Sequence, residues 1–120
     1  MNVGKKMREY NMRKHRAYDG CDWIYGTSFV EDNDFWFHID GEGNNTVVGT
    51  PEPPTGVYDK NGKEIYLNDI VKRKDYVGVI KFGNGRFFIE WRNGPFYTSD
   101  LDTALIKHTE IIDNVTEERL

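Results

Sequence analysis

Residues 55–91, TGVYDKNGKEIYLNDIVKRKDYVGVIKFGNGRFFIEW, decide the fold class of this 120-residue chain. The stretch alternates short runs of β-branched and aromatic residues with tight-turn signals. Asn61-Gly62 is typical of a two-residue hairpin, because both residue types tolerate the positive φ that a type I′ turn requires. Gly83-Asn84-Gly85 marks a second hairpin. Short strands with such closely spaced turns predict a small barrel or sandwich, and a first loop followed by a meander favours an SH3-like β-barrel.

The last strand of this stretch has two unlike faces. Phe87, Ile89 and Trp91 share one of them by the two-residue period of a strand, and we expect Trp91 to belong to the core. Gly78 lies inside the preceding strand, residues 76–82. A glycine there indicates either a bulge or a close backbone approach.

Residues 1–54 predict a separate, smaller lobe. It would consist of a basic N-terminal arm and a small antiparallel sheet that packs on the barrel of residues 55–120. Three strands are expected in this sheet, over residues 23–30, 35–39 and 46–48. The sequence GTPEPP at residues 49–54 predicts a linker, because its three prolines cannot donate hydrogen bonds to a ladder.

Beyond the central stretch, Asn93-Gly94 predicts another hairpin, with residues 96–98 as the return strand. Ser99 or Asp100 could cap a short helix over residues 101–106. A final strand over residues 107–115 and a frayed tail would follow. The chain is therefore expected to be mainly β, with at most one or two short helices.

Several of these segments resemble the YopX family, small proteins encoded by bacteriophages and prophages of Gram-positive bacteria. The central signature comprises Thr55-Gly56, residues 59–66 (DKNGKEIY) and Asp69-Ile70-Val71. Weaker flanking matches are residues 13–17, Trp23-Ile24-Tyr25-Gly26 and residues 110–114. The resemblance implies a β-rich fold, with an additional strand over residues 11–18, and a phage or prophage origin. It implies no activity and no catalytic residue, because the family is one of unknown function.

The net charge of −4 is unevenly distributed along the chain. Residues 1–20 carry six Lys or Arg against two acids, whereas residues 21–56 carry seven acids and no Lys or Arg. This segregation favours internal pairing, with the arm near Glu31, Asp32 and Asp34, or a docking surface for a charged partner.

Composition also bears on the location of the protein. No apolar run approaches the roughly 20 residues that a membrane-spanning helix needs. The basic N-terminus lacks the following apolar segment that a secretory signal requires. The single cysteine, Cys21, has no partner for an internal disulfide. We therefore expect a cytoplasmic protein with no membrane partner. The resemblance to the YopX family implies that this cytoplasm is that of an infected or lysogenic bacterial host.

No catalytic or metal-binding site is predicted, and no cofactor or enzymatic activity is expected. Residues 40–45, DGEGNN, are rich in oxygen ligands but lack the spacing of a calcium loop, so a solvated turn is favoured. His15, His38, His108 and Cys21 are too scattered to indicate a zinc site.

A candidate binding surface is predicted where basic and aromatic residues alternate in the second half of the chain. Its members are Lys72, Arg73, Lys74, Tyr76, Lys81, Arg86, Phe88 and Arg92. We expect a non-catalytic binding module for a protein partner. The alternative is single-stranded nucleic-acid binding, in which aromatic rings stack on bases and cations follow the phosphates. The oligomeric state stays open.

Overall fold

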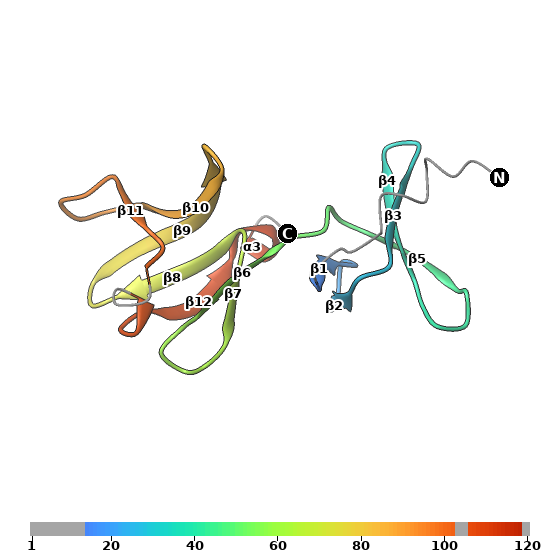
Figure 1. Cartoon of the computed structure of the whole chain (residues 1–120), viewed down its shortest axis with the longest axis horizontal. Coiled ribbons are helices and arrows are strands. Elements are labelled where there is room, and N and C mark those ends of the chain that lie inside the picture. Colours follow the sequence, from blue (N-terminus) through green and yellow to red (C-terminus); the bar gives the residue numbers. More distant parts are fainter. Residues whose placement is uncertain (1–13, 103–105, 119–120) are drawn as a thin grey trace. The chain divides into compact units, whose positions relative to one another are not determined.

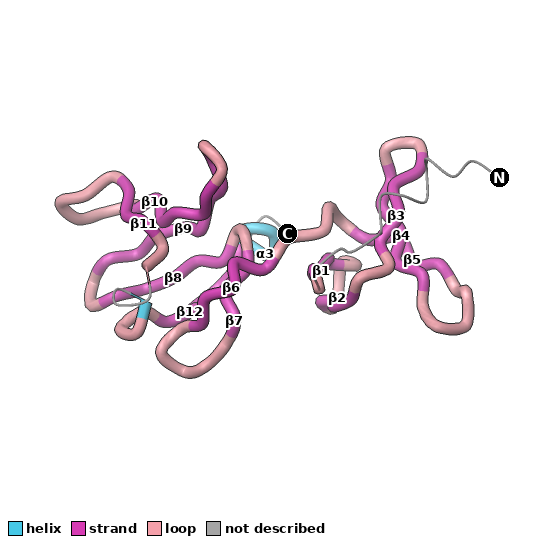
Figure 2. Tube along the Cα trace, in the orientation of Figure 1, coloured by secondary structure: helices cyan, strands magenta, loops and turns pink. Residues whose placement is uncertain are grey.

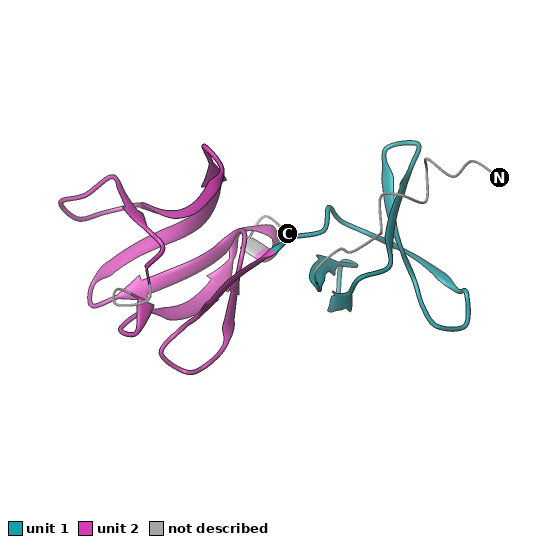
Figure 3. Ribbon diagram, in the orientation of Figure 1, with its two compact units in different colours: residues 1–53 teal, residues 54–120 magenta. Residues whose placement is uncertain are grey.

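The computed structural model describes residues 14–102 and 106–118, and strands dominate these residues (Figures 1 and 2). The mainly β fold expected from the sequence is confirmed. The chain divides into two compact units, unit 1 with residues 1–53 and unit 2 with residues 54–120 (Figure 3).

Unit 1 contains two small antiparallel sheets. Strands β1 (His15–Tyr18) and β2 (Trp23–Gly26) pair as a hairpin, and β3 (Phe29–Asp32), β4 (Phe35–Ile39) and β5 (Asn45–Val48) form a three-stranded sheet. The single strand predicted over residues 23–30 is wrong, because the chain leaves the first sheet at Thr27-Ser28 and enters the second. The part of the predicted strand 11–18 that falls on residues 11–13 lies outside the described residues.

The core of unit 1 is small. Ala17, Phe29 and Val48 are buried, and the partly buried side chains of Ile24 and Trp36 pack against them. Each of these side chains comes from a different one of the five strands, so the two sheets share one core.

A buried ion pair supplements that core. Arg16 Nε donates to Glu52 Oε1 over 3.0 Å, and the backbones of the two residues exchange hydrogen bonds of 3.1 and 2.6 Å. The Arg16 guanidinium also lies 4.3 Å from the centre of the Trp23 ring. Arg16 of the predicted basic arm thus pairs with an acid of the proline-rich segment, because that segment runs along β1.

Unit 2 contains a hairpin and a larger sheet. The hairpin joins β6 (Pro54–Tyr58) and β7 (Glu64–Tyr66). The sheet has the order β11-β10-β9-β8-β12. Its strands are β8 (Asp69–Arg73), β9 (Tyr76–Gly83), β10 (Arg86–Trp91), β11 (Thr98–Asp100) and β12 (Glu110–Asn114). This sheet ends at β11 and β12, so the described residues form no closed barrel.

The two hairpin turns predicted in unit 2 differ in type. Asn84 and Gly85 have φ angles of 53° and 79°, as a type I′ turn requires. At the first hairpin only Gly62, with φ of 80°, has a positive value, so the type I′ prediction for Asn61-Gly62 is wrong. The cause is Asp59, whose Oδ1 accepts hydrogen bonds from the N–H groups of Asn61 and Lys63, both over 2.9 Å, and holds a longer loop.

One face of the five-stranded sheet carries the core of unit 2. Val71, Ile80 and Ile89 are fully buried on it, and Ile65 of the β6–β7 hairpin and Ile106 pack over them. We call this the inner face and the opposite side the outer face. The antiparallel register assigns every paired residue to one of the two faces.

Gly78 lies opposite Trp91 on the inner face. A Cβ atom at this position would be 2.5 Å from Ile89 Cγ2 and 2.9 Å from Trp91 Cε3. The pairing of β9 with β10 stays regular there. The glycine therefore lets two side chains of β10 approach the backbone of β9 closely, and it does not mark a bulge.

The last part of the chain departs from its predicted boundaries. β11 begins at Thr98, so Phe96 and Tyr97 belong to a loop and not to the return strand, because Pro95 interrupts pairing before them. β12 is shorter at both ends than the predicted strand 107–115. The predicted tail instead contains helix α3 (Val115–Glu118), which Asn114 caps by accepting the Thr116 N–H over 2.7 Å.

The helix predicted over residues 101–106 falls partly on residues 103–105, which lie outside the described residues. Within the part of the chain that is described, no helix is long and apolar enough to cross a membrane.

Candidate functional site

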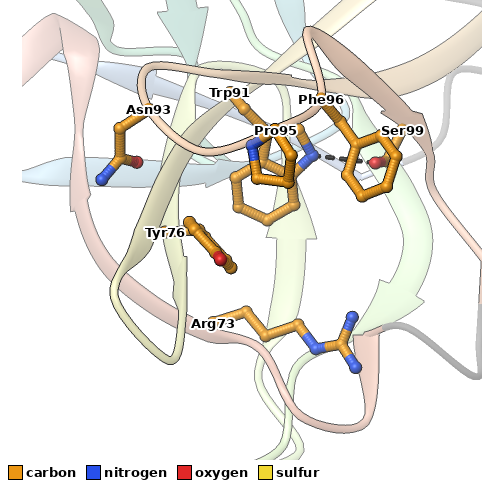
Figure 4. Close-up of a pocket in the computed structure, with 7 residues that line it drawn as sticks. All are labelled: Arg73, Tyr76, Trp91, Asn93, Pro95, Phe96 and Ser99. Atoms are coloured by element: carbon orange, nitrogen blue, oxygen red, sulfur yellow. Dashed lines mark hydrogen bonds between the residues drawn. The ribbon is translucent and has the colours of Figure 1, made fainter.

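A pocket of about 190 Å³ opens at one end of the inner face of unit 2 (Figure 4). Its walls are largely aromatic, with one cation and two small polar side chains. The lining residues are Arg73, Tyr76, Trp91, Asn93, Pro95, Phe96 and Ser99. Figure 4 shows the rings of Trp91, Pro95 and Phe96 on one side and the Arg73 side chain on the other.

The sheet supplies four of these side chains to one face. Arg73 and Tyr76 are register partners at the end of the β8–β9 hairpin. Ser99 of β11 lies opposite the core residue Ile89, and its Oγ accepts a 2.8 Å hydrogen bond from the Trp91 indole Nε1. That bond fixes the plane of the indole and satisfies its donor.

The 92–97 loop, which joins β10 to β11, supplies the other lining residues. Asn93 anchors it to the β8–β9 hairpin, because its Oδ1 accepts the Val77 N–H over 2.8 Å and its Nδ2 donates to the Asp75 carbonyl over 2.9 Å. At the other end of the loop, the Trp91 N–H donates to the Tyr97 carbonyl over 2.8 Å. The loop is therefore held at both ends without any ligand.

Gly94 brings this loop onto the ring of Tyr76. Its φ is 96°, and a Cβ atom there would be 2.6 Å from Tyr76 Cδ1. The Tyr76 and Trp91 rings are 6.4 Å apart in an edge-to-face arrangement. Only glycine meets both demands, a left-handed backbone and a ring against the Cα atom.

Large aromatic side chains remain exposed around the opening. Tyr76 is 40% exposed, Phe96 66% and Tyr97 90%. A second hollow of about 260 Å³ is lined by residues 91–97 of the same loop. Clustered exposed aromatics are typical of a surface that recognises a ligand or partner.

Arg73 is the charged group of the pocket. Its Nε is buried and has no hydrogen-bond partner among the residues that the structure describes. No acidic residue is among the described residues that line the pocket. By contrast, Arg16 pairs with Glu52, and Arg86 Nη1 lies 3.1 Å from Asp100 Oδ1.

The eight predicted surface residues do not share one face of the sheet. Arg73 and Tyr76 line the pocket, Arg92 lines the neighbouring hollow, and Lys74 is exposed in the β8–β9 turn. The register assigns the remaining four to the outer face: Lys72, Lys81, Arg86 and Phe88. The predicted surface is therefore not continuous.

Sequence reasoning missed Asn93, Pro95, Phe96 and Ser99 as site residues, and it predicted that Trp91 belongs to the core. Trp91 packs against the core and also lines the pocket. A signal was present in Pro95, which directly follows Asn93-Gly94 and cannot join a ladder. The aromatic residues that follow it could have been assigned to a loop on that ground.

The acidic residues of the central signature hold turns. Asp59 accepts three backbone N–H bonds, including one of 3.1 Å from Ile111 to its Oδ2. Asp69, also buried, accepts the Tyr66 N–H over 2.8 Å. The contacts of both carboxylates are structural.

The acidic loop at residues 40–45 is likewise a turn. Asp40 accepts the N–H groups of Asn44 and Glu42, over 2.9 and 2.8 Å, and these bonds hold the pKa of Asp40 below its usual value. Within the described ranges, no three His, Cys, Asp or Glu side chains are grouped as a metal site would require.

Fold and pocket together define a small, mainly β protein with a preformed aromatic pocket at one end of an antiparallel sheet. The chain belongs to the YopX family: the family model described as YopX protein matches residues 5–119. The family expected from residues 55–91 is thereby confirmed. No curated protein matches the chain.

Proposed function

We propose that this protein is a non-catalytic binding module whose pocket in unit 2 holds a segment of a protein partner. The observation that carries the proposal is the preformed aromatic pocket with a solvent-exposed aromatic rim. Tyr76, Trp91 and Phe96 supply rings of the kind that dominate the energetics of protein interfaces. Because Asn93 and Ser99 already hold the walls, little conformational entropy remains to be lost on binding.

Binding to single-stranded nucleic acid is the second candidate. Two arginines support it, since Arg73 lies in the pocket and Arg92 lines the adjacent hollow. Against it stands the distribution of the other cations, because Lys72, Lys81 and Arg86 are assigned to the outer face. A strand stacked on the pocket would thus meet few of the phosphate contacts on which such binding depends.

The test is capture from bacterial lysate, with and without nuclease, using three forms of the chain. The intact chain and Phe96→Ser are compared with the control Phe35→Ser, which removes an equally exposed aromatic residue on β4 of unit 1. We expect a protein that survives nuclease and is retained by the intact chain and by the control. Phe96→Ser should retain less than about a tenth of it, as for a well-packed interface residue.

Two results would contradict the proposal. Equal capture by all three forms would place the binding site outside the pocket. Loss of every partner after nuclease treatment would favour the nucleic-acid alternative.

The proposal extends to the cellular setting. A phage or prophage accessory role in the host cytoplasm is supported by membership of the family and by the free, exposed thiol of Cys21. An SH3-like ancestry for unit 2 belongs to the same proposal, and its support is the meander β8-β9-β10-β11.

A further inference from the structure

The Arg73 guanidinium, whose Nε has no partner among the described residues, limits what the pocket can accept. Buried polar atoms of proteins are almost always hydrogen-bonded, so a buried Nε without a partner among the described residues calls for an explanation. The donors of an arginine side chain form a planar, cationic fork that fits a carboxylate. A ligand that brings an acceptor would satisfy it.

Two of the other polar groups of the pocket, the Asn93 amide and the Trp91 indole N–H, are already engaged. Both atoms of the Asn93 amide bond the β8–β9 hairpin, and the Trp91 indole donates to Ser99. Arg73 is therefore the group with the most unused hydrogen-bonding capacity, and the remaining walls are rings. Such a lining fits an apolar body with one negatively charged acceptor beside it.

The size of the pocket indicates how much of the ligand enters. Sites that enclose a drug-sized molecule have volumes of about 300–1,000 Å³, and this pocket has about 190 Å³. One side chain fits that space better than a whole nucleotide does. The rest of the ligand would then run over the exposed rings of Phe96 and Tyr97.

We propose that the occupant is an extended segment of a protein partner, with one apolar side chain in the pocket and a neighbouring Asp or Glu carboxylate on Arg73. This inference rests on the proposed function and deepens it. Charge complementarity argues for it, because Arg73 faces no acid among the described residues that line the pocket.

The probe is a set of fluorescent eight-residue peptides in a Gly/Ser background. Each carries one central Leu, Pro or Phe and one Glu at a varied neighbouring position, and each has a matched peptide with Gln in place of Glu. Binding is measured by anisotropy with the full chain, Arg73→Gln, Arg73→Lys and the control Lys72→Gln. The control removes the same charge one residue away, on the outer face.

For at least one pair, we expect the Glu peptide to bind the full chain about tenfold more tightly than its Gln counterpart, as for a charge-assisted pair. Arg73→Gln should bind the Glu and Gln peptides equally. Its affinity for the Gln peptide should stay within about twofold of that of the full chain. Arg73→Lys should keep part of the ratio, because it keeps the charge but not the fork. Lys72→Gln should behave like the full chain, and thermal melting would verify that all variants fold.

Equal affinities for the Glu and Gln peptides, or a Glu preference that survives Arg73→Gln, would overturn this inference. Failure of every peptide to bind would also reject it. None of these three results decides whether the pocket binds protein. The comparison of Phe96→Ser with Phe35→Ser in lysate answers that question separately. Binding of oligothymidylate but of no peptide would overturn both proposals.

Discussion

Asp59 shows at the scale of one residue how a member of the family signature can serve the fold. Its Oδ1 accepts the N–H groups of Asn61 and Lys63, and its Oδ2 accepts that of Ile111. The Asp59 side chain itself is buried, and backbone N–H groups in a folded chain need an acceptor. The carboxylate therefore shapes the β6–β7 turn and also ties it to β12.

Replacing Asp59 with Ala should lower the free energy of unfolding of unit 2 by roughly 2–4 kcal/mol, because three backbone donors lose their acceptor. Asp59→Asn is the matched variant: its Oδ1 can still accept from the turn, whereas its amide nitrogen cannot accept from Ile111. Urea titration should give Asp59→Asn a free energy of unfolding between those of the native protein and Asp59→Ala. A melting temperature unchanged in Asp59→Ala would refute the role assigned to this carboxylate.

At the scale of an element, the 92–97 loop is ordered by contacts at its ends. Asn93 bridges to Val77 and Asp75, and Gly94 lies against the ring of Tyr76. These contacts lie outside the main apolar core, so they set the form of the pocket more than the stability of the unit. A loop of this kind can change without loss of the fold.

Asn93→Ala should therefore cost only about 1–2 kcal/mol, the amount expected for two exposed hydrogen bonds. The Val77 amide, which donates to Asn93 Oδ1, should exchange with solvent faster. Asn93→Asp keeps that acceptor and loses only the donor to Asp75. The Val77 amide should therefore stay protected from hydrogen exchange in this variant. Hydrogen exchange followed by NMR separates the two variants, and an unchanged Val77 rate in Asn93→Ala would show that the bond does not hold the loop.

At the scale of the whole molecule, each unit has its own sheets and its own core. Ala17, Phe29 and Val48 form the core of unit 1, and the isoleucines around Ile80 and Ile89 form that of unit 2. In unit 1 the buried Arg16–Glu52 pair accompanies a small apolar core. Loss of one partner from a buried pair leaves an uncompensated charge.

Glu52→Ala should destabilise unit 1 by about 3–5 kcal/mol, which approaches the whole stability of a small domain. Because unit 2 has a separate core, the amides of Ile80 and Ile89 should keep their protection from hydrogen exchange. Glu52→Gln, which can still accept from Arg16 Nε, should cost less. Simultaneous loss of protection in both units would show that they unfold as one.

The sequence by itself determined the features that depend on neighbours along the chain. Alternation predicted the faces of β10, the Asn84-Gly85 turn followed from φ preferences, and the signature in residues 55–91 identified the family. Each is a local steric or pattern property, so each could be inferred without a partner strand.

Only the tertiary structure decided how those pieces combine. A run of alternating residues does not specify its register against another strand, yet the register assigns Arg73 and Tyr76 to the pocket and Lys81 and Phe88 to the outer face. Asp59 also ties its turn to β12 by accepting the N–H of Ile111, 52 positions away, which no local pattern predicts. The pocket, too, combines β8, β9, β10, β11 and a loop, because burial and hydrogen bonding act between segments that are distant in sequence.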